Sequence, residues 1–264
     1  MVMSLFLGDK NPGNHATLTR SGTSMKFSIV IPAHNEEKYI GACFDAIEVA
    51  GARVDCDIEI IVVVNRCIDR TEEIARSRGA VIVHEDARCL AKIRNTGAKV
   101  ARGEILITID ADSIMPENTL QSVSEVIDGG DVIGGGAIVV PDRWSPGLAI
   151  TYFFLYAGLI LARLSGGMYY CVREDFDAIG GFNEELVFGE DLEFSKRLKK
   201  YAKSRKKKYR TLWDVRILTS MRKFDRFGDW YFFKLIFYGI KSFRAKDKEK
   251  LNKIIEEYFY DFEN

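Results

Sequence analysis

The strongest constraint on the fold is a set of short runs rich in Val and Ile, each followed by a segment with helical character. Residues 27–31 read FSIVI, 58–64 read IEIIVVV, 80–84 read AVIVH and 104–109 read EILITI. Runs this apolar predict strands buried on both faces, and the helices between them supply the crossovers that parallel strands need. We therefore expect an α/β fold with a mostly parallel central sheet flanked by helices.

The expected helices are residues 36–50, DRTEEIARS at 69–77, LAKIRNTGAKVA at 90–101, and a segment that opens after Pro116. In sheets of this type, ligands bind beyond the carboxyl ends of the strands. The polar segments PAHNEE, NRCID and DADS follow three of the runs. We therefore expect the functional site at that edge of the sheet.

The pattern changes after Asp131. We expect a further strand at 131–140, an apolar helix at 148–162, and a helix within GEDLEFSKRLKKY. Short strands would follow the basic run KSRKKKYR, and two amphipathic helices would close the chain.

We find no internal repeat and no clear linker, so we expect one domain at 25–224 with a helical extension at 225–264 packed on it. Residues 1–24 are rich in Gly, Asn, Ser and Thr and have no basic region before their short apolar run. This pattern predicts a disordered leader rather than a signal peptide.

Charge and cysteine content narrow the class of partner and the compartment. The 264 residues carry 38 basic and 38 acidic side chains, so no global field favours nucleic acid, and the basic run is interpreted as a solvated face. The five cysteines are odd in number and form no Cys-x-x-Cys pair. With no secretory signal, these features predict a reduced, cytoplasmic setting.

The stretch EILITIDADSIMPE ends in two carboxylates, Asp110 and Asp112. Residues i and i+2 of an extended chain point to the same side, so both carboxylates can face one cation. Mg²⁺ and Mn²⁺ take such oxygen ligands and often share them with substrate phosphates. An ordinary solvated turn is the alternative, and the pair alone does not decide between them.

Three segments in this order, FSIVIPAHNEEKYIGACFDAI, IDADS and GFNEELVFGEDLEFSKRL, resemble the family 2 glycosyltransferases with the GT-A fold. The resemblance extends from Phe27 to about Phe224. It implies an inverting, metal-dependent enzyme that moves a sugar from a nucleotide-diphosphate donor to a hydroxyl or phosphate acceptor. The cofactor would be a divalent cation, Mn²⁺ or Mg²⁺.

The resemblance also implies roles for individual residues. Those implied to bind the nucleotide are Pro32, Ala33, His34, Asn35, Glu36, Asn65, Asp69, Arg94, Asn95, Asp110, Ala111 and Arg222. Asp112 would bind the metal directly, and Asp110 would reach the ribose or the ion's water shell. Glu190 and Asp191 would face the acceptor, with Asp191 as the catalytic base.

One departure from the family pattern concerns the nucleotide base. After the second strand the family has Asp-Asp-Gly-Ser-Thr-Asp, whereas this chain has VNRCID. Aligned on Asp69, the carboxylate that typically contacts uracil becomes Val64 and its neighbour becomes Asn65. Valine accepts no hydrogen bond, whereas asparagine offers a donor and an acceptor. A guanosine-linked or other donor therefore stays open beside a UDP-sugar.

Ordinary structural roles compete with several of these assignments. Asp191 opens a predicted helix, where a carboxylate is favoured simply by the helix dipole, and His34 is compatible with a buried structural histidine. All three histidines precede the Asp-x-Asp pair, so no late histidine is available as a third ligand. We therefore expect phosphate oxygens and water to complete the metal shell, and weak metal binding without nucleotide.

Two apolar segments bear on membranes and assembly. Residues 148–162 are shorter than the roughly twenty needed to span a bilayer, which favours a buried helix or an oligomer contact over docking at a membrane interface. Residues 229–246 interleave aromatics with Lys and Arg, which favours an amphipathic cover helix. Peripheral membrane contact and a homodimer stay open.

Two rival interpretations of the whole chain remain. A scaffold protein that binds a nucleotide sugar without catalysis would keep the fold, although the pair Asp112 and Asp191 argues against lost activity. A nucleotidyltransferase would share the sheet and the metal, but it would want a Gly-rich, basic loop after the first strand, where this chain has PAHNEEKYIG.

Overall fold

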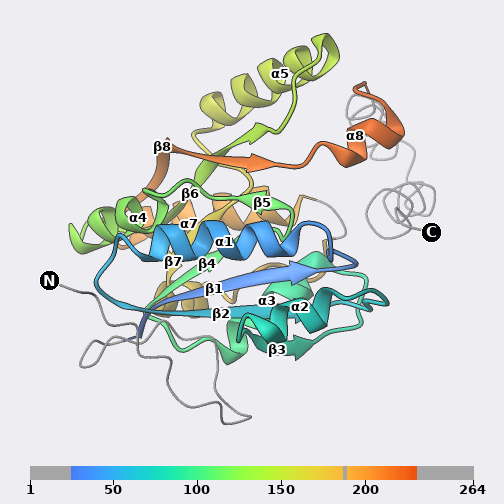
Figure 1. Ribbon diagram of the computed structural model, residues 1–264. Coiled ribbons are helices and arrows are strands. Elements are labelled where there is room, and N and C mark those ends of the chain that lie inside the picture. The colour runs from blue at the N-terminus through green and yellow to red at the C-terminus, as the bar shows by residue number, and fades with distance from the viewer. Residues whose placement is uncertain (1–24, 187–188, 231–264) are drawn as a thin grey trace, which may run out of the picture.

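One sheet passes through the molecule with its strands in the order β3-β2-β1-β4-β7-β6-β8-β5 (Figure 1). The computed structural model describes residues 25–186 and 189–230. The predicted leader at 1–24, and the predicted extension from residue 231 onward, lie outside the described residues.

The first half of the sheet is parallel, as expected. It consists of β1 (Met25–Ala33), β2 (Asp57–Val64), β3 (Val81–His84) and β4 (Ile105–Thr108). The crossovers are α1 (Ile40–Gly51), α2 (Thr71–Ser77) and α3 (Leu90–Val100). The predicted strands and helices are present, although α1 begins later than expected because residues 37–39 form a turn.

Both faces of this half are covered, which explains the unbroken Val/Ile runs. Alternate residues of a strand point to opposite faces. Ile29 and Ile31 face the core beneath α1, whereas Val30 faces the core beneath α3. At Gly97 of α3, an added Cβ would lie 2.4 Å from Cγ1 of Val30, so only glycine allows α3 to approach the sheet this closely.

The second half of the sheet is mixed rather than parallel. It comprises β5 (Ser113–Ile114), β6 (Val132–Pro141), β7 (Tyr169–Val172) and β8 (Lys208–Thr219). β7 lies antiparallel between β4 and β6, β6 and β8 are parallel, and β5 is antiparallel to β8. The short strands expected after the basic run are one 12-residue strand.

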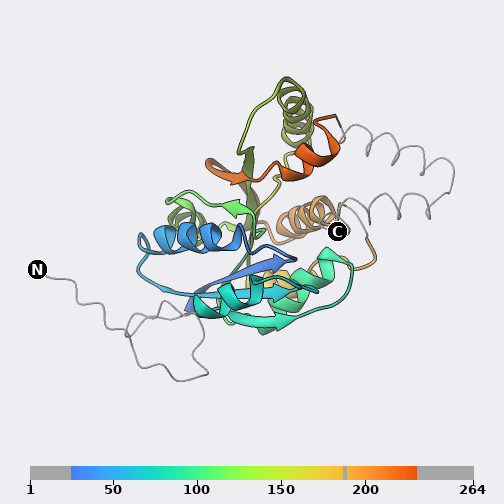
Figure 2. The same cartoon turned by 45° about the vertical axis from the view of Figure 1, so that its right-hand side comes forward.

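The remaining helices are α4 (Thr119–Asp128), α5 (Pro146–Ala162), α6 (Arg173–Ala178), α7 (Glu190–Ser204) and α8 (Arg222–Phe227). The helices predicted within 148–162 and GEDLEFSKRLKKY are α5 and α7. Arg222, one of the residues implied to bind the nucleotide, is the first residue of α8. Both ribbon views place α5 and α8 at the end of the molecule opposite β3 (Figures 1 and 2). Among the described residues, no helix is long and apolar enough to cross a membrane.

Candidate active site

The loops that follow β1 and β2 are fastened together at the carboxyl edge of the sheet. Asn35 Oδ1 accepts a hydrogen bond from Ile68 N at 2.9 Å, and Thr71 Oγ1 accepts one from Glu36 N at 2.6 Å. Asn35 has a positive φ of 53°, a conformation that asparagine tolerates better than most residues. Sequence reasoning singled out Asn35 and Glu36, but it missed Thr71, which fixes the second loop to the first.

Asp69 is the carboxylate that holds this junction. Its Oδ2 accepts from Glu37 N at 3.0 Å, and its Oδ1 accepts from Thr71 N at 3.0 Å and from Thr71 Oγ1 at 2.6 Å. Burial acts to raise the pKa of Asp69, but the hydrogen bonds from Thr71 and Glu37 outweigh it and lower the pKa. The carboxylate is thus held in its charged form by the two loops.

The predicted site residues nearest to the end of β1 have structural roles. Pro32 and Ala33 are buried within β1. His34 Nδ1 lies 2.6 Å from the carbonyl oxygen of Asn65, which ties the first loop to the end of β2.

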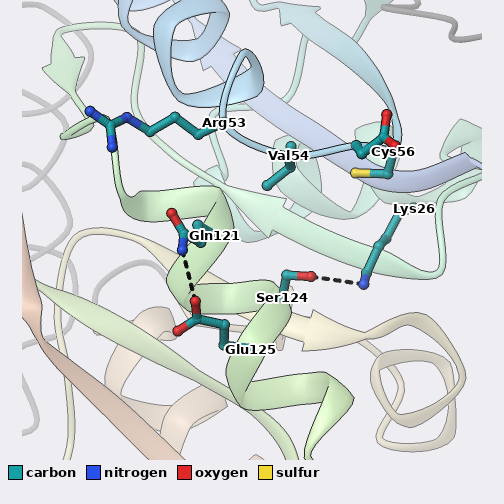
Figure 3. A pocket seen from close by; sticks show the side chains of 8 residues that line it. Lys26, Arg53, Val54, Cys56, Gln121, Ser124 and Glu125 are labelled. Carbon is teal, nitrogen blue, oxygen red and sulfur yellow. Dashed lines mark hydrogen bonds between the residues drawn. The ribbon is translucent and has the colours of Figure 1, made fainter.

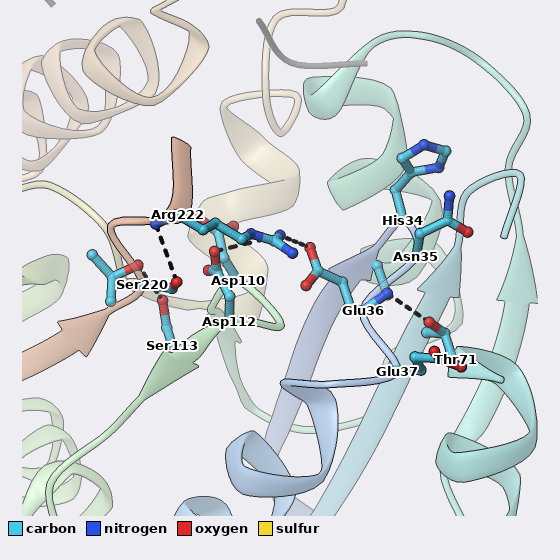
Figure 4. A network of polar contacts seen from close by, with 12 residues as sticks. His34, Asn35, Glu36, Glu37, Thr71, Asp110, Asp112, Ser113, Ser220 and Arg222 are labelled. Atoms are coloured by element: carbon cyan, nitrogen blue, oxygen red, sulfur yellow. Dashed lines mark hydrogen bonds and ion pairs between the residues drawn. The ribbon is translucent and has the colours of Figure 1, made fainter. Parts of the chain in front are cut away.

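Arg222 connects the Asp-x-Asp turn to the first loop (Figure 4). Its Nη2 lies 3.6 Å from Asp112 Oδ2 and forms an ion pair with Glu36 Oε1. Its guanidinium carbon lies 4.7 Å from the centre of the Tyr39 ring. The side chains of Arg222, Asp112 and Glu36 are 14%, 15% and 11% exposed, so these charges meet largely out of water.

Arg94 makes a matching connection on the other side of the Asp-x-Asp turn. It is 4% exposed, and it donates to Glu190 Oε1 at 2.9 Å and to Asp110 Oδ1 at 3.1 Å. Its guanidinium carbon lies 5.4 Å from the centre of the Phe182 ring. Burial acts to lower the pKa of Arg94, but Asp110 and Glu190 outweigh it and raise the pKa, so the guanidinium stays charged.

Glu190 and Asp191 form the first turn of α7, where carboxylates are favoured by the helix dipole. Burial raises the pKa of Glu190, and Asp191 raises it further against the opposing effect of Arg94. Asp191 Oδ2 accepts a hydrogen bond from Tyr169 Oη at 3.2 Å, and its Oδ1 accepts from Leu192 N at 2.7 Å. Asp191 thus sits beside a buried charged pair and is oriented by a tyrosine of β7.

Not every predicted residue joins this group. Asn65 is 1% exposed, and its Nδ2 donates to the carbonyl oxygens of Glu85 and, at 3.0 Å, Ala87. Asn95 Nδ2 donates to the carbonyl oxygen of Phe182 at 2.9 Å, and its Oδ1 accepts from Phe182 N at 2.9 Å. Both amides hold neighbouring backbone in place. Ala111, between the two aspartates, is 2% exposed.

Two further residues of the site escaped sequence reasoning, Tyr39 beneath Arg222 and Tyr169 beside Asp191. Tyr39 follows PAHNEEK directly in the sequence, so its position next to a predicted site loop could have indicated it. Tyr169 belongs to β7, whose place beside β4 depends on a long-range strand pairing.

Among the hollows of the described residues, two lie near opposite ends of β1. One of about 470 Å³ adjoins Arg222 and is lined by Asn35, Glu37, Lys38, Tyr39, Ile68, Asp69 and Arg222. The other, of about 260 Å³, involves Lys26, near the opposite end of β1 (Figure 3). There Lys26 Nζ donates to Ser124 Oγ at 2.8 Å and Gln121 Nε2 to Glu125 Oε1 at 2.8 Å, so polar lining groups pair with one another. The first hollow is the one lined by predicted site residues, Asn35, Asp69 and Arg222, at the edge of the sheet named in the sequence analysis.

The carboxylates of Asp110 and Asp112 are suitable for a hard divalent cation, which prefers oxygen ligands. Among the described residues, however, no group of three His, Cys, Asp or Glu side chains is placed to hold a metal ion. A cation here would therefore need further ligands from a substrate or from water.

A comparison with known families and relatives agrees with this architecture. Residues 28–171, more than half of the chain, match the family model described as Glycosyl transferase family 2. The uncharacterized glycosyltransferase EpsJ of Bacillus subtilis (strain 168) is 32% identical over 116 residues, which are 41% of this chain and 33% of EpsJ. The match thus spans about a third of that relative's length.

Solved structures of glycosyltransferases share the fold. S. aureus TarS, in a crystal structure with UDP, has a TM-score of 0.59 and 21% identity, and the match covers 75% of this chain and 61% of that chain. The mannosyltransferase PcManGT of Pyrobaculum calidifontis, in complex with GDP-Man and Mn²⁺, has a TM-score of 0.55 and 21% identity, covering 76% and 60%. These likenesses confirm the GT-A fold, and the family match shows that the chain belongs to glycosyl transferase family 2.

Proposed function

We propose that the protein transfers a sugar from a nucleotide-diphosphate donor to a hydroxyl or phosphate acceptor, with inversion at the anomeric carbon and with the help of a divalent cation. The observation that carries this proposal is the chain of charges Glu36–Arg222–Asp112 and Asp110–Arg94–Glu190 at one edge of the sheet. It brings groups suited to a diphosphate next to carboxylates suited to an acceptor.

The donor side of the proposal rests on the joined loops and on Arg222. The hollow lined by Asn35, Tyr39 and Asp69 is open to a nucleoside, and Arg222 stands at its wall. During transfer the leaving diphosphate gains negative charge, and a fixed guanidinium lowers the barrier by stabilising that charge. Arg222 would turn from Asp112 toward the phosphates once a donor is bound.

Asp112 and Asp110 are the residues that would hold the cation. When bound, such an ion neutralises developing charge on the diphosphate. The solved structure of PcManGT in complex with GDP-Man and Mn²⁺ supports a divalent cation as the cofactor of this chain.

On the acceptor side, Asp191 would take the proton of the attacking hydroxyl while the hydroxyl oxygen bonds to the anomeric carbon and the bond to the diphosphate breaks. The hydrogen bond from Tyr169 orients one carboxylate oxygen of Asp191. Glu190 is engaged in its ion pair with Arg94 and would fix the start of α7, which leaves Asp191 as the proposed base. Direct displacement needs no covalent intermediate on the protein.

The base of the donor is proposed to differ from uracil. Val64 is 3% exposed and offers no acceptor, and the Asn65 amide donates to backbone carbonyls. No carboxylate therefore follows β2 directly to accept the N–H of uracil. Guanosine-linked donors are the first alternative to test.

The test uses the full chain with a panel of UDP- and GDP-linked sugars, with and without Mn²⁺, and measures release of the nucleoside diphosphate. A thermal-shift panel with GDP and UDP accompanies it, because a ligand that binds only the folded state raises the melting temperature. We expect Mn²⁺-dependent release from a GDP-sugar and a GDP-specific shift. Release from UDP-sugars alone would refute the base assignment, and binding without release from any donor would favour a scaffold.

A further inference from the structure

Helix α5 is largely apolar, yet one of its faces is exposed. Its 17 residues, PGLAITYFFLYAGLILA, contain no charged side chain. Helices that are hydrophobic on all sides are normally buried. Here Phe153 is 69% exposed, Phe154 59% and Leu161 86%. No other described residue covers this surface, and an apolar surface of this kind marks an interaction site.

The exposed side chains form one continuous stripe. Phe153 and Phe154 lie three and four residues after Ile150, and Ile160 and Leu161 lie seven residues after Phe153 and Phe154, so all five lie on one side of the helix. Ala157 and Gly158 lie between them. None of these side chains can donate or accept a hydrogen bond.

The polar side chains of α5 turn the other way, toward the protein. Thr151 Oγ1 donates to the carbonyl oxygen of Asp229 at 3.3 Å, and Tyr156 Oη donates to the carbonyl oxygen of Val139. Tyr152 is 6% exposed, with its hydroxyl 3.8 Å from Met221 Sδ. The helix thus separates its hydrogen-bonding groups from its outer face completely.

The two ends of α5 carry different side chains. Trp144, 62% exposed, lies just before the helix, and Trp230, 52% exposed, has Cε2 3.4 Å from where a Cβ on Gly147 would lie. At the other end, exposed Arg163 follows the helix, and Lys199 Nζ donates to the carbonyl oxygen of Arg163 at 3.2 Å. Tryptophan is typical of the boundary between lipid and water, and clustered cations attract anionic headgroups.

We propose that α5 lies flat on an anionic lipid surface, with its stripe in the acyl boundary, Trp144 and Trp230 at the headgroups of one end, and Arg163 and Lys199 at those of the other. The exposed tryptophans at one end of the stripe and the cations at the other suit the headgroup layer on either side of an acyl boundary, so a lipid surface fits the stripe better than a second copy of the chain. This inference is independent of the donor, the metal and the catalytic residues.

The primary test is sedimentation of the full chain with vesicles of phosphatidylcholine alone and of phosphatidylcholine mixed with phosphatidylglycerol. We expect the wild-type chain to bind the mixed vesicles. Phe153→Ser/Leu161→Ser should bind them at least tenfold more weakly, because two large apolar side chains no longer enter the lipid. Arg163→Glu should weaken binding to the mixed vesicles severalfold. The matched control is Val49→Ser/Val100→Ser, which alters two exposed apolar residues elsewhere, 52% and 43% exposed. Thermal unfolding checks that each variant folds.

Tryptophan fluorescence gives a second readout. Trp144→Phe and Trp230→Phe should each reduce the blue shift on adding mixed vesicles, whereas Trp213→Phe, on β8 and 53% exposed, should not. Sedimentation velocity completes the test. The proposal is wrong if the wild-type chain binds neither kind of vesicle. It is also wrong if Phe153→Ser/Leu161→Ser converts a dimer to a monomer, which would assign the stripe to a second copy.

Discussion

Arg222 lies with its Nη2 3.6 Å from Oδ2 of Asp112, at the carboxylate that is proposed to bind the cation. The same guanidinium pairs with Glu36 and stacks on Tyr39. Arg222 and a divalent cation would therefore repel each other at Asp112. A bound diphosphate would resolve this conflict, because its negative charge would attract both the cation and the guanidinium.

Arg222→Gln is expected to bind Mn²⁺ more tightly than the wild type when no nucleotide is present. Two unit charges 4 Å apart interact by about 1 kcal/mol in water and about 4 kcal/mol near a protein surface. Relief of this repulsion should therefore raise Mn²⁺ affinity by about tenfold, measured by calorimetry. The same variant should release nucleoside diphosphate more slowly. Arg226→Gln, an exposed arginine of α8, is the control, and equal affinities in all three proteins would contradict the competition.

The arrangement around Arg94 predicts a cost in stability. Its ion pair with Glu190 joins side chains that are 5% and 10% exposed, whereas Asp110 is 41% exposed. Removing one member of a buried pair costs about 3–5 kcal/mol, since the other charge stays buried alone. Arg94→Met should therefore lower the free energy of unfolding in urea by about 3 kcal/mol.

A second variant separates charge from packing at this position. Arg94→Met/Glu190→Gln removes both charges, so it should be more stable than Arg94→Met alone. Arg76→Met breaks an exposed pair with Glu72 and should cost no more than about 1 kcal/mol. If the double variant recovers nothing, the cost of losing Arg94 arises from packing rather than from the unpaired carboxylate.

The parallel half of the sheet was predictable because each strand is buried on both faces, and such burial leaves an unbroken apolar run in the sequence. β2 is the clearest case, with all eight residues buried. Its neighbours in the sheet come from adjacent segments of the chain, so strand order follows from short crossovers.

The mixed half was harder to predict, because its pairings join distant segments. β7 pairs with β4, and β8 pairs with β5, more than 60 residues away in the chain. No local pattern in YYCV indicates that it enters the sheet beside β4. The sequence therefore does not indicate Tyr169, although the resemblance implies a role for Asp191, which Tyr169 contacts.

The hydrogen-bond partners of buried polar side chains also could not be predicted from the sequence. Asn65 and Asn95 stand next to predicted site residues, yet their amides hydrogen-bond to backbone. An asparagine is chemically suited to either task, and the three-dimensional surroundings decide which one it performs.

The surroundings of Glu59 allow a prediction of how the free energy of unfolding changes with pH. This carboxylate, 1% exposed, accepts from Ser28 Oγ at 2.5 Å and from Arg102 Nε at 3.0 Å. Burial acts to raise the pKa of Glu59, but the hydrogen bonds from Ser28 and Arg102 outweigh it and lower the pKa from 4.5. A lowered folded-state pKa adds stability above the unfolded-state value, and that stability is lost as the pH falls through the folded-state pKa.

The wild type should therefore exceed Glu59→Gln in unfolding free energy at neutral pH, and the difference should shrink as the pH drops below about 4.5. Urea unfolding of both proteins from pH 7 downward measures the difference, in which other titrating groups cancel. Glu73→Gln, an exposed partner of Arg70, serves as the control with little change. A difference that grows toward acid pH would reverse the sign and rule out the assignment.

Tyr169 predicts a kinetic effect without a loss of donor binding. Its hydroxyl lies 3.2 Å from Asp191 Oδ2 and also 3.1 Å from the carbonyl oxygen of Ser165, so one proton serves two acceptors. Tyr169→Phe keeps the ring packed against Phe182 and Phe194 and removes only the hydroxyl. A hydrogen bond to a charged group is worth about 1.5–3 kcal/mol, so we expect a fall in kcat of about tenfold or more with KM for the donor unchanged.

The matched control is Tyr170→Phe. Tyr170 is the next residue of β7, and its hydroxyl donates to the carbonyl oxygen of Arg210 at 2.7 Å, away from the site. Both variants should lose similar stability, but only Tyr169→Phe should lose rate. Equal kcat values in the two variants would show that Tyr169 does not position Asp191.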